Sequence, residues 1–315
     1  MENVYVIAGP TASGKTAVAV ALAQRIGGEV VSADSMQIYT GMDIGTAKPT
    51  AYERDGVPHH MMDIVAPDEP YSAALYQQQA RAAIKDIHAR GKMPILCGGT
   101  GFYINAVLYD VLFDKSDSDE LLRTQLTTEA ASKSPAYMHE QLQKLDPHAA
   151  FAIHPNNVKR VIRALSYCQS TGLLFSQYNA TQKKRHSLYN AAFVCLAMDR
   201  DILYQRINQR VHAMIDAGLV DEVANLLAKG YCPSLVSMQG IGYKEIVPLL
   251  EGRCSHLDAI SAIQQNSRHY AKRQMTWFRN QNPTAFNMSL GGMTPMEIAE
   301  RICKETAVNV IPPRA

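Results

Sequence analysis

Apolar residues along the chain form short runs that alternate with longer helical patterns. The short runs predict β strands at residues 4–8, 28–33, 59–65 and 93–97. The patterns between them predict helices at residues 17–25 and 71–90. Strands and helices that alternate in this way are typical of an α/β fold with a parallel sheet. From residue 121 to about residue 190 the pattern is helical, with helices expected at 121–131, 136–145 and 158–171.

The first predicted strand leads into a loop with the pattern G-x-x-x-x-G-K-T, followed at once by a helix. Backbone N–H groups of such a loop point inward, and the helix adds the positive end of its dipole, so the loop can hold a diphosphate. Lys15 supplies a mobile cation, and the Thr16 hydroxyl can ligate Mg²⁺. The diphosphate ligands expected from the loop are Gly9, Thr11, Ala12, Ser13, Gly14, Lys15 and Thr16.

Three further features lie on elements that can reach this loop. Asp34 follows the second strand, and Thr100 follows the strand at 93–97 within the run Gly-Gly-Thr-Gly. Carboxyl ends of parallel strands line the ligand crevice, so Asp34 is a candidate general base or outer Mg²⁺ partner; the alternative is a turn or helix N-cap. The Thr100 hydroxyl can contact the reacting group, or its glycine neighbours only permit close packing. Arg210, on a later predicted helix, can reach the diphosphate or remain solvated.

The motifs and patterns together predict two parts. We expect a P-loop NTPase-like parallel sheet core with C-terminal helices, formed by residues 1–113 and 195–315. A charged run at 114–120 opens an inserted all-helical domain at 114–194. The chain is 47% apolar and 19% charged, which excludes disorder, collagen and coiled coil as dominant states.

The net charge of +2 conceals a segregation of charge. Residues 147–198 and 259–296 contain ten Lys and Arg but no Asp or Glu, and contribute +10. The rest of the chain, with 21 Lys and Arg against 29 Asp and Glu, contributes −8. Basic residues without acids suit a phosphate backbone, and the aromatic Tyr270 and Trp277 in the second stretch suit base stacking. The alternative is a solvated basic face with a core tryptophan.

Cysteines and the N-terminus point to an ordinary cytoplasmic protein. The six cysteines are scattered and none forms a C-x-x-C pair, which favours reduced thiols over a zinc site. The chain carries neither a secretory leader pattern nor an apolar stretch near the ~20 residues that span a bilayer. We expect a cytoplasmic protein that does not enter membranes and is a monomer.

The ordered motifs resemble those of the tRNA dimethylallyltransferases, also called tRNA isopentenyltransferases, over nearly the whole chain. The motifs that carry the resemblance lie at residues 9–16, 34–39, 43–49, 58–60, 98–101 and 272–279. The cysteine/histidine zinc finger of some eukaryotic relatives is absent from the sequence, which favours the compact bacterial type. His212 stands where the family usually has an acid.

The resemblance implies transfer of a dimethylallyl group from dimethylallyl diphosphate to N6 of the adenine at position 37, 3′ to the anticodon of tRNA. It implies Asp34 as general base and Thr100 near the reacting centre. The residues themselves predict Arg210 among the diphosphate ligands and Mg²⁺ as cofactor at Thr16. The resemblance also implies that the helical insertion helps to grip the anticodon stem-loop. The tRNA contacts that it implies are Asp34, Ser35, Met36, Gln37, Thr100, Arg123, Lys159, Arg160, Arg163, Gly240, Gly242, Tyr243, Lys244, Lys272, Arg273, Trp277 and Arg279.

Two other functions remain open from the residues alone. A small-molecule P-loop kinase would use the same loop for ATP, because the loop indicates a polyphosphate and not a reaction. An RNA-binding nucleotide switch would use the basic stretches without modifying a base. The kinase would lack salt-sensitive tRNA binding, and the switch would lack transfer chemistry.

Overall fold

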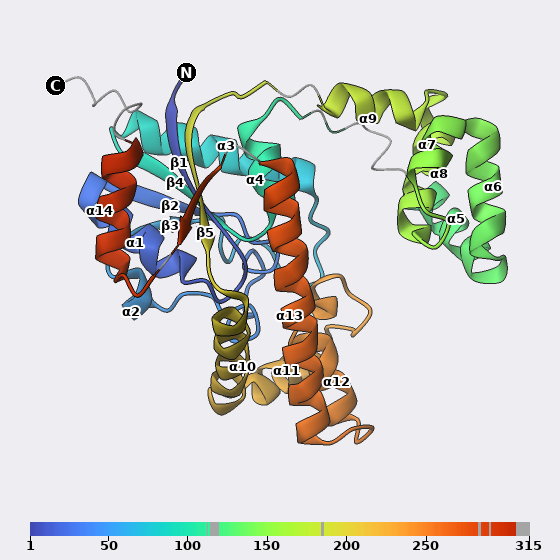
Figure 1. Ribbon diagram of the computed structural model, residues 1–315. Helices are drawn as coiled ribbons and strands as arrows, with labels where there is room; N and C mark the ends of the chain where they lie inside the picture. Colours follow the sequence, from blue (N-terminus) through green and yellow to red (C-terminus); the bar gives the residue numbers. More distant parts are fainter. Residues whose placement is uncertain (112, 114–119, 184–185, 283–284, 290, 307–315) are drawn as a thin grey trace. The chain divides into compact units, whose positions relative to one another are not determined.

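The computed structural model describes residues 1–111, 113, 120–183, 186–282, 285–289 and 291–306 (Figure 1). The chain divides into two compact units, one of Met1–Leu108 with Ser187–Ala315 and the other of Tyr109–His186. The expected insertion at 114–194 therefore needs correction at both ends. Its C-terminal boundary is wrong because residues 190–194 belong to a strand of the sheet. The predicted linker at 114–119 lies outside the described residues.

The larger unit contains a parallel sheet with the strand order β3-β2-β4-β1-β5-β6. Its strands are β1 (Asn3–Ala8), β2 (Gly28–Ser32), β3 (His59–His60), β4 (Met93–Gly98), β5 (Asn190–Ala197) and β6 (Phe286–Ser289). Central strand β1 pairs with β4 and β5, so that Tyr5 lies between Ile95 and Ala192. The predicted α/β class is confirmed.

Two predicted elements differ from the structure. The strand expected at 59–65 ends at His60, because Met61 and Asp63 adopt positive φ angles of 62° and 54° that interrupt an extended chain. Residues 190–194, which the prediction placed in the helical insertion, belong to β5 instead. Pairing of residues 190–195 with β1 determines this strand.

Helices cover both faces of the sheet, as its apolar strands require (Figure 1). On one face, α1 (Lys15–Ile26) and α14 (Pro295–Thr306) pack together over Tyr5, Ile7 and Ile95. On the other, α3 (Ala73–Ala89) packs against α4 (Gly101–Leu108) and against β2 and β4. Alternation along β1 explains both contacts, since successive side chains point to opposite faces.

Below the sheet in Figure 1, four helices of the same unit form a second core. They are α10 (Arg200–Asp216), α11 (Leu219–Ala228), α12 (Tyr243–Leu250) and the long α13 (His256–Gln281). Val211, Val223, Tyr243 and Ile263 lie in this core together with Met42 of the loop after β2. Short α2 (Ala51–Arg54) closes that loop with a capping box between Thr50 and Glu53. Loop and helices therefore share one apolar core.

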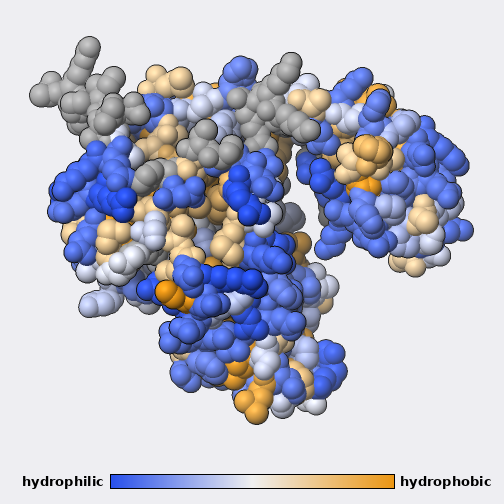
Figure 2. All heavy atoms as spheres, in the orientation of Figure 1, coloured by the Kyte–Doolittle hydropathy of each residue, from blue (hydrophilic) through white to orange (hydrophobic). Residues whose placement is uncertain are grey.

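The smaller unit is helical, as predicted, and has a core of its own. Its helices are α5 (Glu120–Ser132), α6 (Pro135–Leu145), α7 (Pro147–Ala152), α8 (Val158–Thr171) and α9 (Phe175–Lys183). Met138, Leu142, Val161 and Leu165 are buried in that core. The visible surface of both units is mostly hydrophilic (Figure 2). No described helix combines the length and the apolar character that crossing a membrane requires.

Candidate active site

The P-loop connects β1 to α1 with the backbone that its glycines permit. Gly14 has φ 83° and Ala12 has φ 62°, both in the left-handed region. A Cβ at Gly9 would lie 3.0 Å from the Leu196 carbonyl oxygen and 3.1 Å from Ser13 Oγ, so a larger residue would push the loop away from β5. The Ser13 side chain is fully buried, and its hydroxyl has no hydrogen-bond partner among the described atoms. The Ser13 N–H donates to the Pro10 carbonyl oxygen at 3.3 Å, so a role of Ser13 as a diphosphate ligand stays a prediction.

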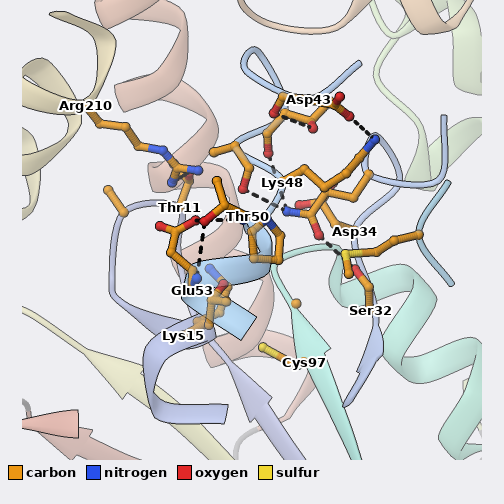
Figure 3. Close-up of a pocket in the computed structure, with 18 of the residues that line it drawn as sticks. Thr11, Lys15, Ser32, Asp34, Asp43, Lys48, Thr50, Glu53, Cys97 and Arg210 are labelled. Carbon is orange, nitrogen blue, oxygen red and sulfur yellow. Dashed lines mark hydrogen bonds and ion pairs between the residues drawn. The ribbon is translucent and has the colours of Figure 1, made fainter. Parts of the chain in front are cut away.

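Two desolvated cations converge on this loop. The Lys15 ammonium donates to the Pro10 carbonyl oxygen at 2.7 Å, and Arg210 reaches from α10 to donate to Thr11 Oγ at 3.3 Å (Figure 3). Burial lowers the pKa of Lys15 to about 8, and the charge of Arg210 acts in the same direction. Burial also lowers the pKa of Arg210. Each cation would regain interaction energy from a multivalent anion at the loop.

These residues line a cavity of about 590 Å³ between the P-loop, the loop after β2 and α10 (Figure 3). Thr11, Lys15 and Thr16 lie on its P-loop side. Apolar parts of its wall come from Val30, Met62, Ala213 and Met214, and from Cys97, whose thiol pKa burial raises to about 12. The cavity thus combines a cationic phosphate site with an apolar wall.

A second cavity of about 320 Å³ shares part of that wall. Asp34 lines both cavities, together with Thr11, Thr46, Arg210 and Tyr270. The remaining wall of the second cavity includes Ser35, Met36, Gly240, Lys244 and Arg273. A carboxylate at the junction can face a molecule in either cavity.

Asp34 is held at this junction by the two loops that follow β2 and β4. Its Oδ1 accepts a hydrogen bond from the Met36 N–H at 2.9 Å, which forms an Asx turn. Asp34 therefore makes the turn that the sequence offered as an alternative, and its carboxylate still lines the cavities. Thr100 Oγ accepts from the Ser35 N–H at 3.2 Å. A Cβ at Gly98 would lie 2.2 Å from the Ala33 carbonyl oxygen. Close packing of the glycine loop is therefore what brings Thr100 beside the Asp34 segment.

Two residues of α13 complete the site. Gln274, only 5% exposed, accepts from the Thr11 N–H at 2.8 Å and donates to the Gly99 carbonyl oxygen at 2.9 Å. Burial and, to a smaller extent, the charge of Asp34 raise the pKa of Tyr270 to about 12. From the sequence, Tyr270 was expected only to stack on bases, and Gln274 had no role of its own within the 272–279 motif, because the prediction followed basic and aromatic side chains. The spacing of four residues, which places Tyr270 and Gln274 on one helix face, is the signal that could have assigned both to one site.

Comparison with known protein families matches residues 37–281 to the IPP transferase family. The chain belongs to this family. A curated tRNA dimethylallyltransferase from Geobacillus thermodenitrificans is 51% identical over 282 residues, which are 90% of this chain and 89% of the relative. Another from Bacillus pumilus is 50% identical over 289 residues, covering 91% and 90% of the two chains. The resemblance stated from the motifs is confirmed.

Solved structures of IPP transferases share the fold. A tRNA isopentenylpyrophosphate transferase from Bacillus halodurans is 44% identical, with a TM-score of 0.73 and 98% of both chains covered. A eukaryotic dimethylallyltransferase acting on tRNA is 28% identical, with a TM-score of 0.82, and covers all of this chain and 81% of its own. These comparisons support a prenyltransferase and give no support to the kinase alternative.

Apart from the loops that carry Asp34 and Thr100, the predicted tRNA contacts of this IPP transferase lie on α5, α8, α13 and the start of α12 with the turn before it. Lys272, Arg273 and Arg279 are exposed on α13, and Arg273 lies over the Tyr270 ring at 5.7 Å. Lys244 is exposed at the start of α12, whereas Gly240, Gly242 and Tyr243 beside it are buried. In the smaller unit, Arg123, Lys159 and Arg160 are exposed on α5 and α8, and Arg163 is half-buried on α8.

Trp277 and Tyr243 have packing roles that the sequence left open. The indole nitrogen of Trp277 would lie 2.0 Å from a Cβ at Gly101, and the ring meets Phe102 edge-on at 6.5 Å. Tyr243 is fully buried. The two side chains therefore pack against the rest of the protein. Direct contact of Trp277 or Tyr243 with tRNA stays a prediction.

Proposed function

We propose that the protein transfers the dimethylallyl group of dimethylallyl diphosphate to N6 of the adenine at position 37 of tRNA, giving N6-dimethylallyladenosine and diphosphate. The observation that carries this proposal is the place of Asp34, at the junction of a cationic P-loop cavity and a second cavity edged by Lys244 and Arg273. The names of the curated relatives support the same reaction.

The donor fits the larger cavity. Backbone N–H groups of the P-loop, Lys15 and Arg210 would hold the diphosphate, and the apolar wall near Val30 and Met214 would receive the dimethylallyl group. The Thr16 hydroxyl lines this cavity and suits Mg²⁺, which keeps several waters and binds mainly through substrate phosphates. Among the described residues, no group of three or more His, Cys, Asp or Glu side chains is placed to hold a metal. The bound ion would neutralise charge on the leaving diphosphate.

The acceptor fits the smaller cavity. An adenine in a loop is unpaired and costs little to remove from its stack, so an anticodon loop nucleotide can enter where a paired one cannot. Lys244 and Arg273 at the cavity wall suit the adjoining phosphates. We assign the anticodon stem-loop of tRNA as the partner, bound by a monomer.

Chemistry at the junction needs a base and a stabilised leaving group. The N6 lone pair forms a bond to C1 of the dimethylallyl group, and the C1–O bond breaks with its electron pair leaving on diphosphate. Asp34 takes an N6 proton as that bond forms, when the amino group becomes acidic. Lys15, Arg210 and the P-loop N–H groups stabilise the charge that develops on diphosphate.

Substitution of the carboxylate tests the assignment. Asp34→Asn keeps the oxygen that accepts from Met36 N–H but removes the base, so transfer of label from dimethylallyl diphosphate to unmodified tRNA should fall by about 10²–10⁴. Binding of tRNA, measured by filter retention, should stay close to that of the wild type. Asp68→Asn, an exposed aspartate outside both cavities, is the matched control. Full transfer by Asp34→Asn, or loss of tRNA binding alone, would refute the base.

A further inference from the structure

The segment 43–49 carries a family motif that the reaction does not explain. It follows Asp34 in the chain and lines both cavities: Ile44 and Ala47 face the larger one, Gly45 the smaller one, and Thr46 both. Lys48 is buried and ion-paired with Asp43 and Asp63, which ties the far end of the segment to the loop after β3. The segment is thus a wall between the proposed donor and acceptor sites.

One carboxylate of α11 holds the near end of this wall. Glu222 accepts hydrogen bonds from three successive backbone N–H groups, those of Asp43 at 3.0 Å, Ile44 at 2.8 Å and Gly45 at 3.1 Å. It also accepts from the Tyr243 hydroxyl at 2.6 Å. Each carboxylate oxygen therefore serves two donors, one oxygen for Asp43 and Ile44 and the other for Gly45 and Tyr243. A charged acceptor with four donors fixes all of them at once.

Tyr243 is the first residue of α12 and lines the acceptor cavity. Two of its ring carbons would lie 2.4 and 2.5 Å from a Cβ at Gly45, so the ring packs directly on the wall segment and position 45 admits no side chain. Three residues earlier, in the turn that precedes α12, a Cβ at Gly240 would lie 2.5 Å from Met36 Cε. The start of α12 and the turn before it therefore contact both the wall segment and the segment after Asp34.

We propose that Glu222 is a positioning residue that couples the two sites, holding the 43–45 wall and the turn before α12 in one arrangement. The inference rests on the proposed function for the identity of the two ligands. The 43–49 segment faces both cavities. A tRNA that orders this segment from the acceptor cavity, where Tyr243 packs on it, therefore also orders its surface in the donor cavity. Binding of either ligand then tightens binding of the other by the same factor.

The test measures that factor without turnover. Dimethylallyl S-thiolodiphosphate, in which sulfur replaces the bridging oxygen and slows cleavage, is titrated into the full-length protein with and without saturating unmodified tRNA. The ratio of the two dissociation constants is the coupling factor, expected to be at least about 5 in the wild type. In Glu222→Gln the amide NH₂ group replaces one carboxylate oxygen and cannot accept hydrogen bonds. Whichever oxygen it replaces, two of the four donors lose their acceptor, so the coupling factor should fall to near unity. Asp221→Asn, the exposed acid next to it on α11, should keep the wild-type factor.

Further outcomes separate coupling from mere stability. Far-UV circular dichroism and a thermal melt report whether Glu222→Gln is folded, and Tyr243→Phe, which removes only the hydroxyl donor, should lose part of the factor. A wild-type factor of one, or weaker binding of both ligands with an unchanged factor in either variant, overturns the inference. Failure of the wild type to label tRNA from natural dimethylallyl diphosphate would instead count against the proposed function.

Discussion

Lys15 and Arg210 are cations kept partly out of water until an anion arrives. Their lowered pKa values reflect burial, with mutual repulsion in addition for Lys15. A diphosphate would reverse both effects, so its binding energy comes largely from charges that the protein has already desolvated. The hydrogen bond from Lys15 to the Pro10 carbonyl oxygen holds the ammonium near the loop in the meantime.

Donor affinity should therefore depend on pH through Lys15. The bound anion favours the charged ammonium, so affinity is full below the free-state pKa of about 8 and falls as pH rises through it. The expected slope is up to about tenfold in dissociation constant per pH unit above that value. Titration of the thiolodiphosphate analogue across this range measures it. Lys15→Arg, which stays protonated, should bind with a flat profile; the same slope in both proteins would contradict the assignment.

Helix α13 presents different chemistry on its two sides. Its exposed side carries Lys272, Arg273 and Arg279, and its buried side carries Gln274, which joins the P-loop to the Gly99 loop. The buried amide thus sets the spacing between the loop that would hold diphosphate and the loop that positions Thr100. A single helix thus carries predicted tRNA contacts on one side and joins the two loops of the candidate active site with the other.

Loss of this amide should impair the donor site more than the fold. Gln274→Leu leaves the Thr11 N–H and the Gly99 carbonyl without their partner, at about 1–3 kcal/mol for each buried group. We expect a lower melting temperature and a fall in kcat/KM for dimethylallyl diphosphate of about tenfold or more. Gln265→Leu, at an exposed position of the same helix, is the matched control. Equal effects of the two variants would remove Gln274 from the site.

Elements with a strong local signal could be predicted from the sequence, and those defined by partners could not. The P-loop and the first strands have apolar runs and punctuating glycines, so their place was evident. By contrast, β5 begins with Asn190-Ala-Ala, which carries little strand preference, and it is a strand because β1 offers its edge. Gln274 carries no charge, and its role depends on two loops more than 170 residues away in sequence.

The charge segregation of the chain places its basic side chains on exposed helices in both units. Lys159 and Arg160 of α8 and Lys272, Arg273 and Arg279 of α13 are exposed. The helix α8 lies in one acid-free stretch, and α13 lies in the other from residue 259 onward. The remainder of the chain is mildly acidic. Such a distribution favours one polyanion-binding region on each unit over general attraction to nucleic acid.

The affinity for tRNA should therefore fall as the salt concentration rises. Basic residues of α8 should contribute part of this salt dependence. Neutralising two residues as Lys159→Gln with Arg160→Gln should weaken tRNA binding about tenfold at low salt and reduce the salt slope by about 1–2. The rate at saturating tRNA should be unchanged, because these residues lie outside both cavities. Lys133→Gln with Lys144→Gln, basic residues of the same unit outside the acid-free stretch, form the control. Equal salt slopes in all three proteins would contradict a role for α8.

The proposed reaction places a dimethylallyl group on one adenine of tRNA. Unmodified tRNA is incubated with the full-length protein, dimethylallyl diphosphate and Mg²⁺, digested to nucleosides and examined by mass spectrometry. We predict N6-dimethylallyladenosine in place of the adenosine 3′ to the anticodon, and no product from a tRNA with guanosine at that position. Unchanged nucleosides, or a dimethylallyl group on another base, would contradict the account.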